Sequence, residues 1–206
     1  MSKNFNKVMK SLIRDIQADI DRYVKLGNHL TLLSKMKMYI LNEPLWYLLV
    51  YRLGTYLNKD FKIPLLRQAF YLIFYVVHKF LSVVTGIQIP LSTDIGKGVY
   101  LPHFGTIVVH QKSIIGEHCN IGQGVTIGVA GRGARRGTPI IGNYVYIEPG
   151  AKIIDNIRIG NNVMIGANAV VTKDVPDHTV VGGVPAKIIS FNGWETEGNP
   201  FNEIKK

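Results

Sequence analysis

The residues of this chain that could carry acid–base or nucleophilic chemistry are few. The sequence of 206 residues holds six histidines and one cysteine, Cys119. A single cysteine excludes an internal disulfide and leaves no cysteine cluster for zinc, so its expected role is that of a small buried residue. Histidine is then the residue type best suited to accept a proton from an attacking group near neutral pH.

A basic, glycine-rich segment is a second feature that could contact a charged ligand. Residues 131–137 read GRGARRG. They lack the glycine spacing and the strand-to-helix context of a dinucleotide-binding fold. We therefore expect a basic loop, residues 129–139, that interrupts the pattern on either side of it.

The elements that would position these residues follow from a six-residue repeat. Such a period fits neither a helix nor a simple strand, and it is typical of a β-helix solenoid in which each face adds one aliphatic residue to an interior column. Three faces give a coil of 18 residues. The repeat is clearest at Ile141, Ile147, Ile153, Ile159, Ile165 and Val171.

The same frame starts earlier and slips once. It slips by two residues after Ile107 and is interrupted again at the loop, so roughly five coils are expected between residues 89 and 190. Glycines and Asn162 would form the corners, where small or left-handed residues are required. The earlier members of the frame are Ile89, Ile95, Leu101, Ile107, Ile115, Ile121 and Ile127.

The first 88 residues are expected to be helical. Apolar residues recur at three- and four-residue steps between Phe5 and Val24, which predicts an amphipathic helix. Pro44 and Pro64 would open two further helices, about 45–58 and 65–84. We expect three parts: a helical domain at 1–88 for oligomerisation or contact with a membrane surface, a β-helix at 89–190, and a tail at 191–206.

Charge and targeting signals narrow the classes of partner. Residues 1–88 hold 13 Lys and Arg against 5 Asp and Glu. No recognised nucleic-acid module accompanies this charge, so an anionic membrane surface, an acidic polymer or solubility alone explains it better. The membrane contact would be made by the aromatic stretch Phe70–Phe80, which Arg67 and Lys79 flank. The start of the chain has no apolar signal region, which predicts a cytoplasmic protein, peripheral on the inner face of the membrane if it binds lipid.

Five strings of the sequence resemble the serine acetyltransferase branch of the hexapeptide-repeat acyltransferases. They are residues 86–90 (GIQIP), 95–106 (IGKGVYLPHFGT), 124–128 (GVTIG), 165–176 (IGANAVVTKDVP) and 183–188 (GVPAKI). The resemblance implies a left-handed parallel β-helix, a homotrimer or a dimer of trimers, and acetyl-CoA as acetyl donor with no metal. His103 matches the general base of the family, and no covalent enzyme intermediate is expected.

Other site residues are carried over by the same resemblance. Gln88 stands where the family has the carboxylate that orients the base, and its amide oxygen could take that role. The loop covers the active site in the family, which makes Arg135 and Arg136 candidates for substrate contact. The expected contacts to CoA are Ala167, Thr172, Lys173 and Lys187, with the lysines on phosphates.

Departures from the family pattern bear on the acceptor. Pro102 and Gln111 replace acidic residues, and Thr138 replaces a histidine. Because an ammonium group without a carboxylate partner is costly to bury, we expect free serine to fit poorly. The sequence also resembles exopolysaccharide and capsule O-acetyltransferases, so the favoured acceptor is a sugar hydroxyl of a cell-surface polysaccharide or its precursor. The alternatives are a serine O-acetyltransferase and a non-catalytic solenoid scaffold.

Overall fold

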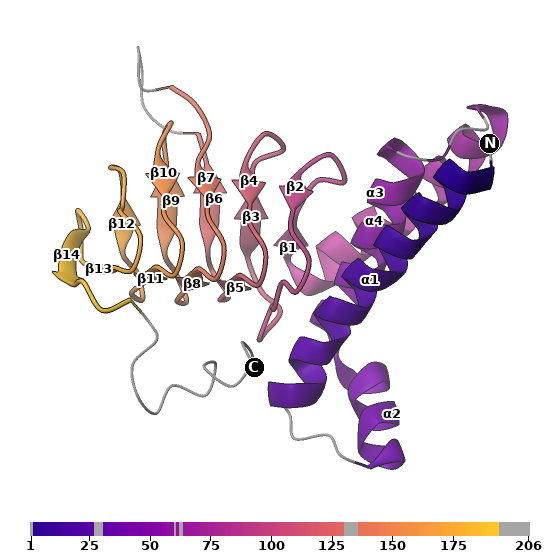
Figure 1. The fold of residues 1–206 in the computed structure, drawn as a ribbon, viewed down its shortest axis with the longest axis horizontal. Coiled ribbons are helices and arrows are strands. Elements are labelled where there is room, and N and C mark those ends of the chain that lie inside the picture. Colours follow the sequence, from indigo (N-terminus) through magenta and orange to yellow (C-terminus); the bar gives the residue numbers. More distant parts are fainter. Residues whose placement is uncertain (1, 27–30, 60, 62–63, 130–135, 194–206) are drawn as a thin grey trace.

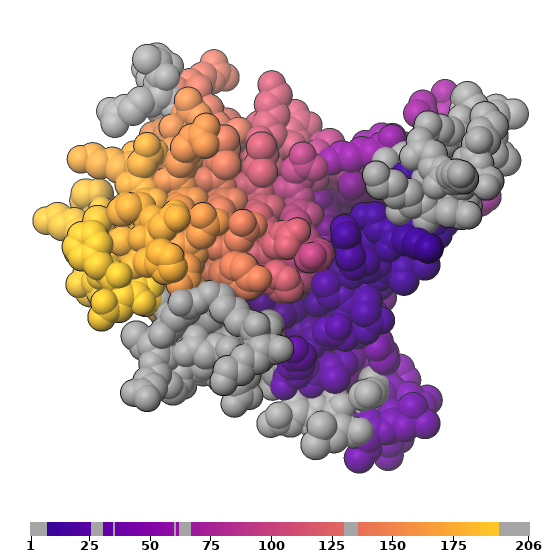
Figure 2. Space-filling view, in the orientation of Figure 1, coloured from indigo at the N-terminus to yellow at the C-terminus, as the bar shows by residue number. Residues whose placement is uncertain are grey.

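The structure is a computed structural model that describes residues 2–26, 31–59, 61, 64–129 and 136–193. The helices gather at one end of a three-sided coil of short strands (Figure 1). In the space-filling view the helical unit abuts the first coils, and the coil extends away from it (Figure 2). The predicted order of a helical part followed by a solenoid is confirmed.

Four helices are described: α1 Ser2–Leu26, α2 Leu32–Leu41, α3 Glu43–Lys59 and α4 Pro64–Thr85. Pro44 and Pro64 lie in the first turns of α3 and α4, as expected, because a first-turn N–H needs no helical partner. The Asn42 side chain accepts a hydrogen bond from the Leu45 N–H at 3.0 Å and so caps α3. The sequence analysis missed α2, whose N-terminus is closed by reciprocal hydrogen bonds between Thr31 and Ser34.

The strands form three sheets, one on each side of the coil, with orders β1-β3-β6-β9-β12, β10-β7-β4-β2 and β14-β13-β11-β8-β5. Every pair is parallel except the hairpin-like pair β13 and β14. The strands are β1 Ile87–Gln88, β2 Asp94–Ile95, β3 Ile107–Val109, β4 Ile114–Ile115, β5 Asn120–Ile121, β6 Thr126–Gly128, β7 Ile140–Ile141, β8 Tyr146–Ile147, β9 Lys152–Ile154, β10 Arg158–Ile159, β11 Met164–Ile165, β12 Val170–Val171, β13 Val180–Gly182 and β14 Lys187–Ser190.

The repeat residues form the core. All six aliphatic residues of the clearest repeat, from Ile141 to Val171, are buried, and they stack on partners one coil away, such as Ile147 on Ile165. Successive coils approach so closely that a side chain does not fit at some corners, and glycine is required there. A Cβ on Gly96 would lie 2.6 Å from the Glu117 nitrogen.

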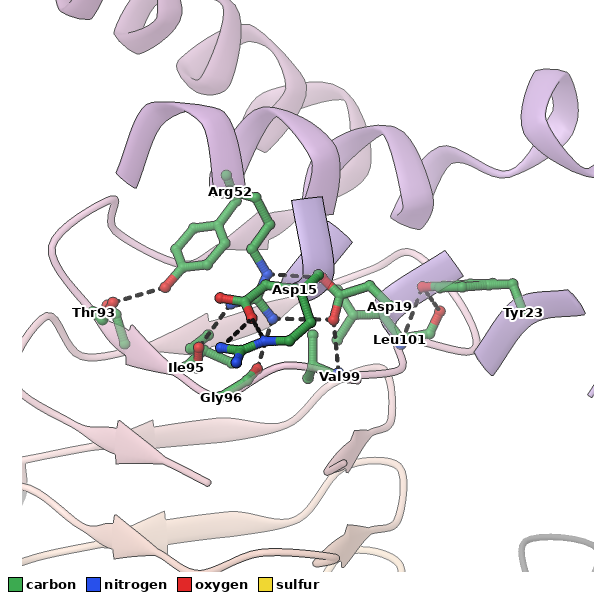
Figure 3. Close-up of polar contacts among 11 residues, drawn as sticks. Asp15, Asp19, Tyr23, Arg52, Thr93, Ile95, Gly96, Val99 and Leu101 are labelled. Atoms are coloured by element: carbon green, nitrogen blue, oxygen red, sulfur yellow. Dashed lines mark hydrogen bonds and ion pairs between the residues drawn. The ribbon is translucent and has the colours of Figure 1, made fainter. Parts of the chain in front are cut away.

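A buried ion pair joins the helical unit to the first coil (Figure 3). Arg52 on α3 donates to both carboxylate oxygens of Asp19 on α1, at 2.7 and 3.1 Å, and also to the carbonyl oxygens of Ile95 and Gly96. Asp19 in turn accepts from the Val99 N–H at 3.0 Å. Burial raises the pKa of the Asp19 carboxyl, and the guanidinium charge opposes that rise. The pair therefore fixes α1, α3 and the first coil together.

Tyrosine hydroxyls make further attachments between the helices and the coil. Tyr23 on α1 donates to the carbonyl of Leu101 at 3.0 Å, and Tyr47 on α3 donates to that of Ile89 at 3.0 Å. Both side chains are buried. The helices thus supply hydrogen bonds to an end of the coil that has no further coil to pair with.

Helix α4, like α2, leaves much of its apolar surface exposed. Its stretch Arg67–Thr85 is, among the described residues, the one that is long and apolar enough to cross a membrane by length and composition alone, and 17% of it is buried. The opposite side of α4 packs on α3 and β1, where His78 and Ser82 are buried.

Removing the arginine of the buried pair should destabilise the fold strongly. Arg52→Met leaves the Asp19 carboxylate buried without its partner, which costs roughly 3–5 kcal/mol in free energy of unfolding. The control, Lys59→Met, breaks the exposed ion pair of Lys59 with Asp94 and should cost about 1 kcal/mol or less. Urea denaturation measures both. Equal losses in the two variants would show that the buried pair does not anchor the helices.

Candidate active site

His103 lies where the chain passes from the third sheet to the first. Tyr100 pairs with Asn120 of β5, and the chain then runs to β3 in the first sheet. The exposed His103 side chain lines a cleft of about 150 Å³ at this edge. The other lining residues are Tyr100, Pro102, Asn120, Gly122, Gln123, Tyr146, Ile147, Glu148 and Pro149.

The parallel register of the strands places the cleft at the first position of a column of stacked residues. Tyr100, Asn120, Tyr146 and Met164 are paired in succession from coil to coil. Counting three residues onward in each coil gives the column His103, Gln123, Pro149 and Ala167. With strands about 4.8 Å apart, His103 and Ala167 are separated by roughly 14 Å along the coil axis. Two residues selected from the sequence, one for catalysis and one for CoA, therefore share one edge.

Glu148 is a cleft residue that the sequence analysis missed. The same register stacks Pro102, Gly122 and Glu148 in successive coils. Gly122 has no side chain, and a Cβ there would come within 2.7 Å of the Pro149 nitrogen, so the close approach of these two coils requires glycine at this corner. Partial burial raises the pKa of the Glu148 carboxyl.

A signal for this residue was present in the repeat. An Ile-Gly pair occurs at Ile121-Gly122 and Ile165-Gly166, and the equivalent position of the coil between them is Ile147-Glu148. A carboxylate that replaces a glycine at one corner of a repeat is a departure that packing does not require.

The residues predicted to contact CoA lie on the last coils. Thr172 and Lys173 follow β12, and Lys187 begins β14. These segments are adjacent, because the Ala186 N–H donates to the Val170 carbonyl at 2.8 Å. Both lysines are exposed and available to an anion, and their contact with CoA stays a prediction.

Gln88 and the two described ends of the basic loop do not line the His103 cleft. Gln88 on β1 lines a different hollow, of about 370 Å³, together with Gln111 and the α4 residues Tyr71 and His78. The loop connects β6 in the first sheet to β7 in the second, so it leaves from a different edge of the coil than His103. Arg136 is exposed there, and Arg135 falls outside the described residues. A role for these three residues at the His103 cleft stays a prediction.

Cys119 and His118, which could also act as a nucleophile or a base, make packing contacts and do not line the His103 cleft. The Cys119 thiol is buried, contacts the Gly142 carbonyl at 3.2 Å, and has its pKa raised by burial to about 12. The ring of His118 stacks on Tyr144 at a centroid distance of 5.1 Å. Over the described ranges, no group of three or more His, Cys, Asp or Glu side chains is placed to hold a metal ion.

Comparisons with known proteins identify the relatives of this coil. A family model described as bacterial transferase hexapeptide (six repeats) matches residues 138–173. A serine acetyltransferase of Synechococcus elongatus is 38% identical over 110 residues, which are 53% of this chain and 45% of that protein. One from Staphylococcus aureus is 40% identical over 109 residues, 53% of this chain and 51% of that protein. The chain thus spans about half the length of the curated relatives it matches.

Solved structures extend the similarity to the helical part. The serine acetyltransferase of Neisseria gonorrhoeae in complex with serine matches with a TM-score of 0.71 at 26% identity, over 91% of this chain and 74% of that one. A serine acetyltransferase in complex with CoA matches with a TM-score of 0.69 at 29% identity, over the same shares. The left-handed parallel β-helix expected from the sequence is confirmed.

The comparisons also correct the expected acceptor. Curated relatives and solved structures alike are serine acetyltransferases, and the Neisseria gonorrhoeae structure is a complex with serine. The prediction of a sugar hydroxyl in a cell-surface polysaccharide is therefore wrong. Its basis, the loss of carboxylates at Pro102 and Gln111, took no account of the carboxylate that Glu148 brings into the cleft from another coil.

Proposed function

We propose that this chain, a serine acetyltransferase-like member of the hexapeptide-repeat, left-handed β-helix acetyltransferases, transfers the acetyl group of acetyl-CoA to the hydroxyl of free serine. The observation that carries the proposal is that His103 and Glu148 line one cleft at the head of the column. A base and a carboxylate in one cleft suit an acceptor with both a hydroxyl and an ammonium group.

His103 acts as the general base in this proposal. Its imidazole takes the serine hydroxyl proton as the oxygen attacks the thioester carbonyl, forming the new C–O bond. Backbone N–H groups of the coil stabilise the oxyanion of the tetrahedral intermediate. The C–S bond then breaks, and the leaving CoA thiolate receives the proton from the imidazolium. Cys119 takes no part, because its thiol is buried and its pKa is about 12.

Glu148 binds the serine ammonium group. It lies two coils from Pro102, a step of roughly 10 Å between backbones, and the glutamate side chain shortens the gap to His103. Serine has its ammonium and hydroxyl on neighbouring carbons, so one molecule can be held at both ends. This carboxylate takes the place of the acidic residues that Pro102 and Gln111 replace.

The donor lies along the column. Acetyl-CoA is a long, flexible molecule, and a path from the His103 cleft to Ala167 of roughly 14 Å suits its pantetheine arm. Its phosphates would then lie near Lys173 and Lys187, exposed lysines on the last coils. Thr172 lies beside them.

A homotrimer completes the site. Within one chain the basic loop leaves from a different edge than His103, so Arg135 and Arg136 would serve the cleft of a neighbouring copy. Gln88 would act across the same interface. Two trimers could associate further through the helical unit. Because serine and acetyl-CoA are metabolites of the cytoplasm, the activity belongs there.

The decisive test of this function is turnover of serine by the full chain. Saturable release of CoA with serine is expected, and His103→Ala should lower kcat by roughly 10²–10⁴ while the circular dichroism spectrum is unchanged. His110→Ala, a change outside the cleft, is the control. Failure to acetylate serine, with efficient transfer to another hydroxyl compound, would reject serine as the acceptor. Full activity of His103→Ala would reject the base.

The ammonium contact predicts a separate kinetic effect for the glutamate. Glu148→Gln should raise KM for serine by roughly 10–100-fold, because a charge-assisted hydrogen bond is lost, and leave KM for acetyl-CoA unchanged. Since the pKa of Glu148 is raised, serine affinity of the parent chain should fall as the pH drops through that pKa, and the variant should lose this dependence. Glu117→Gln, an exposed carboxylate on the coil, is the control. An unchanged KM for serine would exclude Glu148.

The lysines of the last coils should control affinity for the donor. Lys173→Glu and Lys187→Glu each place a negative charge near the CoA phosphates, so binding of CoA should weaken by about 10-fold, with stability unaffected because both side chains are exposed. Isothermal titration calorimetry measures the affinity. Lys10→Glu on α1 repeats the charge change at the other end of the molecule. Equal affinities in all three variants would remove these lysines from the site.

A further inference from the structure

Helix α4 carries a continuous apolar face that nothing in the described chain covers. Eight apolar side chains are between 41% and 75% exposed: Phe70, Leu72, Ile73, Val76, Val77, Phe80, Val83 and Val84. At 3.6 residues per turn they cover an arc of roughly 160° around the helix. Isolated exposed apolar residues are ordinary, but a continuous face of this kind marks a contact surface.

Basic side chains lie on both sides of this apolar face. Lys79 borders the arc on one side and Arg67 on the other, and both side chains are exposed. Tyr75, which is 48% exposed, lies just beyond Lys79. The helix contains no Asp or Glu. Basic residues and a tyrosine at the edges of an apolar face form the pattern of a helix that lies in the headgroup layer of an anionic membrane.

The opposite side of α4 excludes a spanning orientation. His78 is buried there with its ring 5.0 Å from that of Tyr47 on α3. The Thr85 hydroxyl accepts from the Ile87 N–H at the start of β1. A helix crossing the bilayer would have to leave these contacts and expose polar side chains to lipid. Held on α3 and β1, α4 can bury one face only, which requires it to lie in the plane of the membrane.

A second copy of the chain fits this face less well than lipid. A contact between two α4 faces would place Arg67 and Lys79 of both copies at its rim. Neither helix would offer a carboxylate to pair with them.

We propose that the apolar face of α4, between Arg67 and Lys79, binds the surface of an anionic lipid bilayer. The helix lies parallel to the membrane with its phenylalanines and valines among the acyl chains and its two basic residues at the lipid phosphates. The protein is thereby a peripheral membrane protein with its β-helix outside the bilayer. This inference does not depend on the acceptor of the acetyl group.

Co-sedimentation of the full chain with lipid vesicles tests the proposal. The chain should bind vesicles of phosphatidylglycerol and phosphatidylcholine more tightly than vesicles of phosphatidylcholine alone, and added salt should reduce the difference. Ile73→Glu combined with Phe80→Glu changes the centre of the face and should weaken binding by at least ~10-fold. Ile189→Glu, 70% exposed at the far end of the coil, is the matched control and should bind as the parent does.

A second double variant separates the contribution of charge to vesicle binding from that of apolar contact. Arg67→Gln with Lys79→Gln should weaken binding to the anionic vesicles by ~10-fold or more and have little effect on the uncharged ones. Light scattering gives the molar mass of each variant. Parent chain that stays in solution with anionic vesicles at low salt overturns the proposal. If the Ile73→Glu, Phe80→Glu variant then has a lower molar mass than the parent, a second copy covers the face.

Discussion

The parallel backbone ladder between successive coils is the constraint on which the rest of this structure depends. Successive coils exchange hydrogen bonds between backbone N–H and carbonyl groups, such as that from the Asn120 N–H to the Val145 carbonyl at 2.9 Å. The ladder sets a spacing of about 4.8 Å and stacks side chains into columns. Buried aliphatic columns stabilise the coil, and an outer column brings His103 and Ala167 to one edge. Both stability and the candidate site thus follow from one repeated interaction.

The first coil needs hydrogen-bond partners from outside the solenoid. It has a coil on one side only, so its carbonyls at Ile95 and Gly96 would otherwise lack partners, and Arg52 supplies them. Asp19 makes this burial of a guanidinium possible. The same helices bond to Leu101, two residues before His103, through Tyr23. The helical unit therefore acts as a cap for the solenoid and also holds the strand that leads into the cleft.

The wrong prediction of the acceptor has a physical cause. The prediction assumed that the site had lost its negative charge, because Pro102 and Gln111 stand where the family has acidic residues. A cleft between coils is lined by several segments, so a carboxylate can enter it from any of them. Glu148 lines the His103 cleft from a coil two layers away, and close approach of the coils requires glycine at the corner between them.

The sequence by itself determined the coil and most of the helices. The six-residue repeat, the amphipathic pattern after Phe5 and the prolines that open α3 and α4 are local signals, because each depends on residues within a turn or a coil. The short helix α2 left no comparable pattern, since its exposed apolar residues Leu32 and Leu33 have no buried stripe to contrast with.

Only the tertiary structure decided which residues meet between coils. The step from Pro102 to Gly122 is 20 residues and that from Gly122 to Glu148 is 26, because the slip adds two and the loop adds eight to a coil of 18. A fixed period cannot predict such contacts, since insertions change the spacing in sequence while the ladder keeps the spacing in space. For the same reason the structure, and not the repeat, separates Gln88 from the His103 cleft and brings Glu148 into it.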